Sequence, residues 1–285
     1  MGKLVTVLVL GCYLSAVLAE LPHYTVYKSF ETALYECAEY FQVPNCTVQK
    51  YIRESFPDDR EVQVLIRCTL INLGGWDDSI GGRDYVLRNF FAPSADDKCY
   101  ERRTRECIYT TLDSLTYYCP YRRAYETFRC YYRYYGELIT SGQYIPKELN
   151  ELQQLALTGL IISNLPQDVL IQYCRGDIMY ESNFPQLLYL LLIRGGYYSC
   201  RSGFRLDNLY TQVGDPILLD PQTQQCIDGV AREKCNADEV TRVHQSFVRC
   251  LSNIFPLVQY VQEAAKTLVG DGDGCICSNA LYNGN

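Results

Sequence analysis

The sequence of 285 residues predicts an all-α protein with two tandem, disulfide-stapled helical domains. One reason is an internal repeat, since Glu54 to Cys68 resembles Glu181 to Gly195, and Ala33 to Pro44 resembles Ala156 to Pro166. A second reason is the cysteine content, which suits a framework of disulfides. A third is that apolar residues recur at helical spacing, without the sustained alternation that strands require.

The N-terminal segment, residues 1–19, has the features of a secretory signal peptide. Lys3 supplies a positive start, Leu4 to Leu14 an apolar stretch, and Val17-Leu18-Ala19 a small-residue cleavage site. The apolar stretch is too short to span a bilayer, although an uncleaved anchor is the alternative interpretation. We therefore expect a secreted, extracellular protein without a membrane span.

The composition after the signal argues against several classes of function. Of the 15 cysteines, only Cys12 lies in the signal, and an even number in an oxidising compartment favours disulfides over thiols. With no CxxC pair and two histidines, we expect no metal site and no cofactor. No Gly-x-Ser-x-Gly elbow or other catalytic set is recognisable, so we expect no enzyme and name no catalytic residue. The net charge of −7 disfavours nucleic-acid binding.

The first domain, residues 20–136, is expected to contain six helices. Leu34, Cys37 and Phe41 recur at helical spacing, Gly74 stops the third helix, and Pro120 separates the last two. The expected helices are Phe30 to Phe41, Thr47 to Phe56, Val62 to Leu73, Asp84 to Phe91, Cys107 to Tyr118, and Arg122 to Tyr135.

Residues 137–148, which carry Gly142 and Pro146, are expected to be a linker. The second, divergent domain spans residues 149–269, and residues 270–285 form a cysteine-containing tail. In the second domain a loop is expected from Asp215 to Gln224, before the helices Cys226 to Lys234, Asp238 to Ile254, and Leu257 to Val269.

The repeat also suggests how cysteines pair. Cys37 falls opposite Gly159, within one residue, and Cys68 falls opposite Gly195. Because both cysteines are absent from the second copy, we expect them to be bonded to each other in the first.

Several segments of the first copy resemble insect odorant-binding proteins, and more narrowly the two-domain atypical members of mosquitoes. These segments are Glu36 to Tyr40, Leu65 to Cys68, Leu73 to Asp78, Arg88 to Pro93, and Phe128 to Tyr132. The family has six cysteines. Its second is absent here, since Val64 stands at that position, and its fifth should lie near Tyr121, two positions from Cys119.

The resemblance implies three disulfides, because the family bonds its first cysteine to its third and its fourth to its sixth. These pairs would be Cys37–Cys68, Cys107–Cys130 and, in the second copy, Cys226–Cys250. Cys174 and Cys200 have no family equivalent and are expected to replace the lost bridge. The pairing of the other cysteines stays open, namely Cys46, Cys99, Cys119, Cys235, Cys275 and Cys277.

Helices stapled crosswise can enclose a cavity instead of closing up, and apolar molecules gain free energy by entering it. Tyrosines suit its wall, because each has an apolar ring and one hydrogen-bonding end. One of Arg67, Arg129, Arg194 and Arg249 could meet a ligand carboxylate, or all four cap helices. The alternative for the wall is a filled core. The candidate ligand-binding residues are Leu34, Phe41, Leu65, Trp76, Leu87, Phe90, Phe91, Tyr117, Tyr118, Phe128, Tyr131, Tyr132 and Tyr135.

The expected function is transport of small hydrophobic ligands, such as odorants, pheromones or fatty acids, with a chemoreceptor or the extracellular matrix as further partners. Asn45, in the sequon Asn45-Cys46-Thr47, is a candidate glycosylation site. Two alternatives stay open. One is a salivary-type scavenger of host mediators, as in related proteins of blood-feeding flies. The other is an eggshell or cuticle coat cross-linked through its 26 tyrosines.

Overall fold

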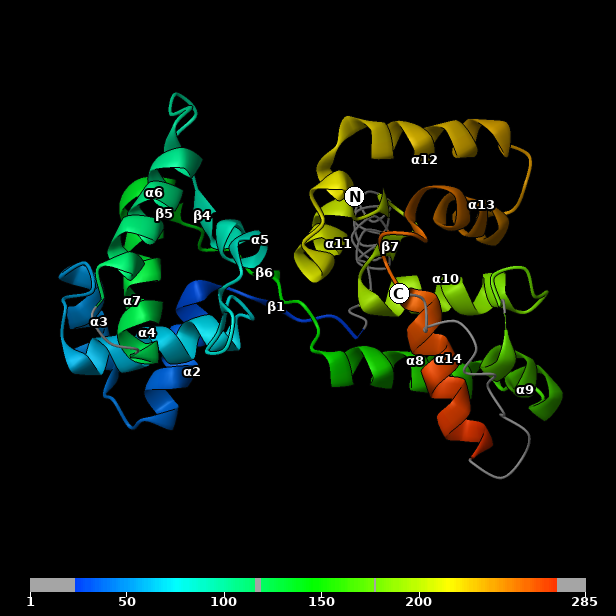
Figure 1. Cartoon of the computed structure of the whole chain (residues 1–285), viewed down its shortest axis with the longest axis horizontal. Helices are drawn as coiled ribbons and strands as arrows, with labels where there is room; N and C mark the ends of the chain where they lie inside the picture. Colours follow the sequence, from blue (N-terminus) through cyan, green and yellow to red (C-terminus); the bar gives the residue numbers. More distant parts are fainter. Residues whose placement is uncertain (1–23, 116–118, 177, 271–285) are drawn as a thin grey trace, which may run out of the picture.

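The computed structural model describes residues 24–115, 119–176 and 178–270, and it is mostly helical. Two bundles lie side by side and are joined by the paired strands β1 and β6 (Figure 1). Each bundle has its own hydrophobic core, one built from residues between Phe30 and Tyr135 and the other between Tyr144 and Val269. The expected all-α fold class is confirmed, and its strands are all two-residue pieces.

The first bundle contains six α-helices, and its last helix continues into the π-helical turn η2. Its helices are α2 (Phe30–Tyr40), α3 (Asn45–Arg53), α4 (Arg60–Asn72), α5 (Asp84–Leu87), α6 (Tyr100–Asp113) and α7 (Pro120–Cys130), with the short turns η1 (Arg88–Phe90) and η2 (Tyr131–Tyr135). Its strands are β1 (Tyr27–Lys28), β2 (Trp76–Asp77), β3 (Gly81–Gly82), β4 (Phe91–Ala92), β5 (Glu137–Leu138) and β6 (Gln143–Tyr144).

The helix α5 is a single turn of four residues, so the five longer helices form the body of the first bundle. The expected helix from Asp84 to Phe91 is therefore divided among α5, η1 and the start of β4. The expected linker is also more ordered than its composition suggested. Its strand β5 pairs with β4 and its strand β6 pairs with β1, which ties this segment to the first bundle.

The second bundle follows the same order of elements and adds a final helix. It consists of α8 (Leu149–Ser163), α9 (Gln167–Arg175), α10 (Phe184–Gly195), β7 (Tyr198–Ser199), β8 (Gly203–Phe204), α11 (Leu206–Val213), η3 (Pro216–Leu219), α12 (Pro221–Glu233), α13 (Glu239–Ser246), η4 (Phe247–Leu251) and α14 (Leu257–Val269). The loop expected from Asp215 to Gln224 is wrong, because η3 lies there and Asp220 caps an earlier start of α12.

From α3 to α5 the two bundles correspond at a distance of 122 positions along the chain, and this distance falls to 119 where Cys107 corresponds to Cys226. Each has a glycine with positive φ, Gly74 at 69° and Gly196 at 79°, directly before its hairpin. The hydrogen bond from the N–H of Gly75 to the carbonyl of Leu70 is repeated from Tyr197 to Leu192. The hairpin pairs correspond in the same way, Trp76 with Gly82 and Asp77 with Gly81 in the first bundle, and Tyr198 with Phe204 and Ser199 with Gly203 in the second.

At this offset the expected counterpart of Cys68 is wrong. Cys37 does lie opposite Gly159, but Cys68 lies opposite Leu190 and not Gly195. The similar letters around Phe56 and Phe184 misled the alignment, because Phe56 precedes α4 whereas Phe184 begins α10.

Three of the expected disulfides are present, Cys37–Cys68, Cys107–Cys130 and Cys226–Cys250. The expected pair of Cys174 with Cys200 is wrong. Cys174 is buried on α9 and disulfide-bonded, whereas Cys200 is an exposed free thiol at the β7–β8 turn. The partner of Cys174 is not among the described cysteines, whose other free members are Cys46, Cys99, Cys119 and Cys235.

Candidate functional site

The expected aromatic wall is largely a packed core. The ring of Phe128 stacks on Phe30 with centroids 5.1 Å apart and on Tyr132 at 5.5 Å, and it meets the edge of Phe56 at 5.0 Å. Such contacts fill space that a ligand would otherwise occupy. The candidates that are buried in this first core are Leu34, Leu65, Trp76, Leu87, Phe90, Phe91, Phe128, Tyr131 and Tyr135.

The four other candidates fall elsewhere. Phe41 is wrong as a wall residue, because it ends α2 and half of its surface is exposed, at 50%. Tyr117 and Tyr118 lie outside the described residues. Tyr132 is partly buried against the core.

Four of the candidates do border space. Leu87 and Tyr131 line a hollow of about 260 Å³ between α5, α6 and α7, which we call the α6–α7 hollow. Tyr132 and Tyr135 line a wider hollow of about 900 Å³ between η2 and the segment that follows β4. Ligand contact by any of these residues stays a prediction.

The α6–α7 hollow combines apolar walls with a buried hydroxyl. Its walls are Leu87 from α5 and Ile108 and Leu112 from α6, which are four residues apart and so share one helix face. The Oγ1 of Thr127 is buried and has no hydrogen-bond partner, and the side chain is 2% exposed. A buried hydroxyl without a partner is uncommon, because it loses the hydrogen bonds that water would give it.

Two other polar groups of the hollow, Tyr131 and Asp84, are already engaged with each other. The hydroxyl of Tyr131 donates a hydrogen bond to Asp84, and burial raises the pKa of that phenol well above its usual range. Arg105 lies at the exposed edge. Thr127 is therefore the polar group of this hollow that is best placed to meet a ligand.

Sequence reasoning missed Thr127, Ile108 and Leu112. The spacing of Ile108 and Leu112 on one helix was a signal that could have been used. Nothing in the sequence indicates that Thr127 is a candidate ligand contact. Its role depends on the tertiary packing, which leaves its hydroxyl without a hydrogen-bond partner.

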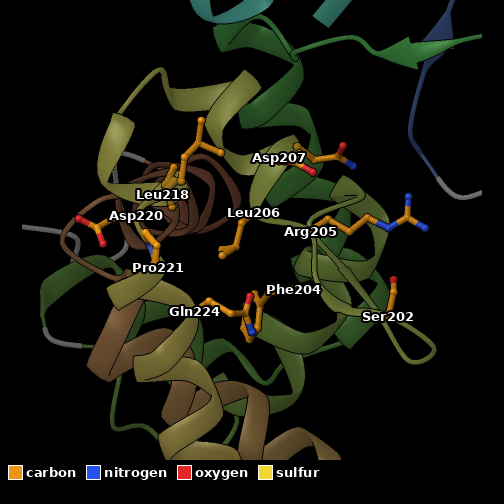
Figure 2. A pocket seen from close by; sticks show the side chains of 11 residues that line it. Ser202, Phe204, Arg205, Leu206, Asp207, Leu218, Asp220, Pro221 and Gln224 are labelled. Carbon is orange, nitrogen blue, oxygen red and sulfur yellow. The ribbon is translucent and has the colours of Figure 1, made fainter. Parts of the chain in front are cut away.

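The second bundle has a hollow of about 530 Å³ at the corresponding place, between its hairpin and η3–α12. Phe204 and Leu206 line it where the first bundle has Gly82 and Asp84. In Figure 2, Leu206 projects between the hairpin residue Phe204 and Leu218 of η3, and charged and amide side chains border the same space. This hollow is thus more polar than the α6–α7 hollow.

Comparison with known proteins found a family model that matches the first bundle. Residues 23–134 match the PBP/GOBP family. Over these residues the first bundle is similar to PBP/GOBP proteins. The resemblance to insect odorant-binding proteins is thereby confirmed for these residues. They include every lining residue of the α6–α7 hollow, and those of the wider hollow up to residue 134.

The chain is also similar to a curated protein. The chain is 27% identical over 165 residues to General odorant-binding protein 69 of Anopheles gambiae, an alignment that covers 54% of this chain and 71% of that protein. No solved structure gave a significant match.

Two further findings bear on the expected partners. Within residues 24–115, 119–176 and 178–270, no helix combines the length and apolar character that a membrane crossing requires. The same described residues contain no cluster of three side chains suited to holding a metal ion.

Proposed function

We propose that this protein is a secreted carrier of small hydrophobic molecules, without catalytic activity, and that its PBP/GOBP domain binds them in the α6–α7 hollow. The family match and the odorant-binding name of the Anopheles relative support a binding role. The observation that carries the location is the orphan hydroxyl of Thr127 among apolar walls.

The free-energy argument for Thr127 is direct. Leaving a hydroxyl buried and unpaired costs about 1–3 kcal/mol, which a ligand hydroxyl or carbonyl would recover. Leu87, Ile108 and Leu112 would cover the hydrocarbon part at about 25 cal/mol per Å² of apolar surface removed from water. Because about 260 Å³ is just below the usual range for ligand sites, we expect small ligands such as short alcohols, aldehydes or ketones.

Disulfides would make such an unfilled interior tolerable. The Cys107–Cys130 bridge joins α6 to α7 directly beside the hollow. Each bridge contributes about 2–4 kcal/mol, comparable with the cost of a small cavity.

We further propose that residues 20–136 and 149–269 are tandem copies of one domain, with the second copy diverged. The offset of 122 positions between the two hairpins supports this division. The Cys226–Cys250 bridge also supports it, because it repeats Cys107–Cys130 at offsets of 119 and 120 positions. The more polar hollow of the second copy would then suit a different, more polar ligand.

The position of the tyrosines favours a carrier over a cross-linked coat. Tyr125, Tyr131, Tyr173 and Tyr197 are among the largest fully buried side chains, so oxidative coupling could not reach them in the folded protein. Asn45 is exposed at the start of α3, which is compatible with glycosylation in a secretory pathway.

The test is displacement of the neutral fluorophore N-phenyl-1-naphthylamine by octan-1-ol and by 1-chlorooctane. Thr127→Val should weaken octan-1-ol by about five- to tenfold, the value of one hydrogen bond, and leave 1-chlorooctane unchanged. Thr104→Val is the matched control. Thr104 also has a buried Oγ1 without a partner and is 2% exposed, but it does not line the hollow.

Two outcomes would contradict the proposal. One is that neither competitor displaces the fluorophore at high micromolar concentration. The other is that Thr104→Val weakens octan-1-ol as much as Thr127→Val does.

A further inference from the structure

A third space lies at the junction of the two bundles. This junction hollow, of about 430 Å³, is bordered by the segment that leads into β1, the end of α4 and the start of α8. Ile71, Ile145 and Pro146 give it apolar walls, and Lys147 is its most deeply buried charged side chain, at 7% exposed.

Lys147 lines this hollow without an ion pair to a described residue, and Arg194 lies near it, since both contact the ring of Tyr24. The Nζ of Lys147 lies 5.2 Å from the ring centre of Tyr24 and 5.7 Å from that of Tyr144, and it forms no ion pair with any described residue. The guanidinium of Arg194 also lies over Tyr24, at 5.7 Å, and its Nε is buried without a hydrogen-bond partner. Two aromatic faces stabilise a buried ammonium only in part.

The three other arginines that the sequence singled out are engaged. Arg67 pairs with Asp78, Arg129 donates to the carbonyl of Phe56, and Arg249 pairs with Glu233. Arg194 differs from them, because its buried Nε has no hydrogen-bond partner.

The acidic groups of the junction hollow are also engaged. Glu151 accepts a hydrogen bond from the N–H of Glu148 at 2.8 Å in the capping box of α8. Glu148 pairs with Arg83 at 3.3 Å, and Lys28 pairs with Glu36 outside the hollow at 2.6 Å. Lys147 thus remains the cation of this hollow that an incoming anion could reach.

We propose that the junction hollow binds the carboxylate of a small organic acid, with Lys147 as its direct partner and Ile71, Ile145 and Pro146 around the hydrocarbon part. A single carboxylate fits better than a phosphate, because Glu148 and Glu151 would repel a second negative charge. The apolar walls favour an organic acid over an inorganic anion. This site is separate from the α6–α7 hollow and does not depend on it.

Binding at this site has a proton signature. Burial lowers the pKa of Lys147 to about 8, and Glu151 opposes that effect weakly. Tyr144 also faces the ammonium, but burial raises the pKa of its phenol far above this range. A bound carboxylate favours the charged amine. At pH 8.5 about three-quarters of the amines are neutral, so binding should take up about 0.7 proton per protein molecule.

The experiment is calorimetric titration of the full chain with sodium octanoate at pH 8.5, in two buffers of different ionisation enthalpy. Wild type should show proton uptake. Lys147→Met should abolish the uptake and weaken octanoate at least tenfold, as expected for loss of a charge-assisted hydrogen bond. Lys28→Met is the matched control, since Lys28 lines the same hollow but is paired with Glu36, and it should change neither quantity.

The result that would overturn the inference is octanoate binding that Lys147→Met leaves at wild-type strength. If octanoate instead binds only in the α6–α7 hollow, Thr127→Val will weaken it and no proton will be taken up. That pattern would reject the junction site and leave the proposed carrier function intact. If octan-1-ol does not displace the fluorophore but octanoate binding still takes up a proton, the α6–α7 site is rejected and the junction site is retained.

Discussion

Lys147→Met should stabilise the protein at neutral pH. Burial lowers the pKa of Lys147 from 10.5 to about 8, a change of roughly 2.5 units, and each unit corresponds to about 1.36 kcal/mol. The charged amine therefore costs the folded state about 3 kcal/mol at pH 7. Methionine has similar length and no charge, but it loses the contacts of the ammonium with Tyr24 and Tyr144, about 1 kcal/mol together. The expected net gain is about 2 kcal/mol.

The effect of Lys147 on the free energy of unfolding depends on pH. Between pH 8 and 10.5 the unfolded chain holds the proton of Lys147 while the folded chain has released it, so this residue makes the free energy of unfolding rise with pH. The cost is fully present below pH 8 and is gone above 10.5. The advantage of Lys147→Met should consequently be largest at pH 7 and small at pH 10.5.

The assay is urea unfolding of wild type and variant at both pH values, followed by circular dichroism with the disulfides intact. Only the difference between the two proteins is compared, because buried tyrosines also affect stability at high pH. Lys28→Met serves as control and should change stability at pH 7 by less than about 1 kcal/mol, since its ion pair is partly exposed. The reasoning is refuted if Lys147→Met destabilises the protein at pH 7, or if its gain is the same at pH 10.5.

Two further predictions concern the bridges. Replacing both Cys37 and Cys68 by alanine should lower the free energy of unfolding by about 3–4 kcal/mol, as expected for a sequence separation of 31 residues, and a loss below 1 kcal/mol in urea unfolding would contradict this. The offset of 122 positions predicts that Gly159→Cys with Leu190→Cys forms a new disulfide, detectable by peptide mass mapping. Gly159→Cys with Gly195→Cys should not, and crosslinking of this second pair instead would reject the structural correspondence.

Local patterns in the sequence predicted most helices, since helical spacing and glycine or proline stops act over a few residues. The same patterns could not determine whether Phe41 is buried, because a residue at the end of a helix can point toward the core or toward solvent. Here Phe41 is half exposed to solvent. Matching letters also failed for Cys68, since Phe56 and Phe184 serve different roles at the starts of their helices.

The sites depended on contacts between distant segments. Thr127 matters because no neighbour reaches its hydroxyl, and Lys147 matters because Tyr24 and Tyr144 bury it. In the sequence Lys147 lies in a segment expected to be a linker, where a lysine is ordinarily solvated. Only the packing of α4 and α8 around the junction gives it a role.

The central claim is that the α6–α7 hollow receives a small apolar guest, and the most direct measurement is a crystal structure of the protein with 8-bromooctan-1-ol. We predict an anomalous bromine signal inside the first bundle and a ligand hydroxyl within about 3.2 Å of the Oγ1 of Thr127, beside Leu87, Ile108 and Leu112. Bromine found only on the surface or in the second bundle, with the α6–α7 hollow closed, would contradict the claim.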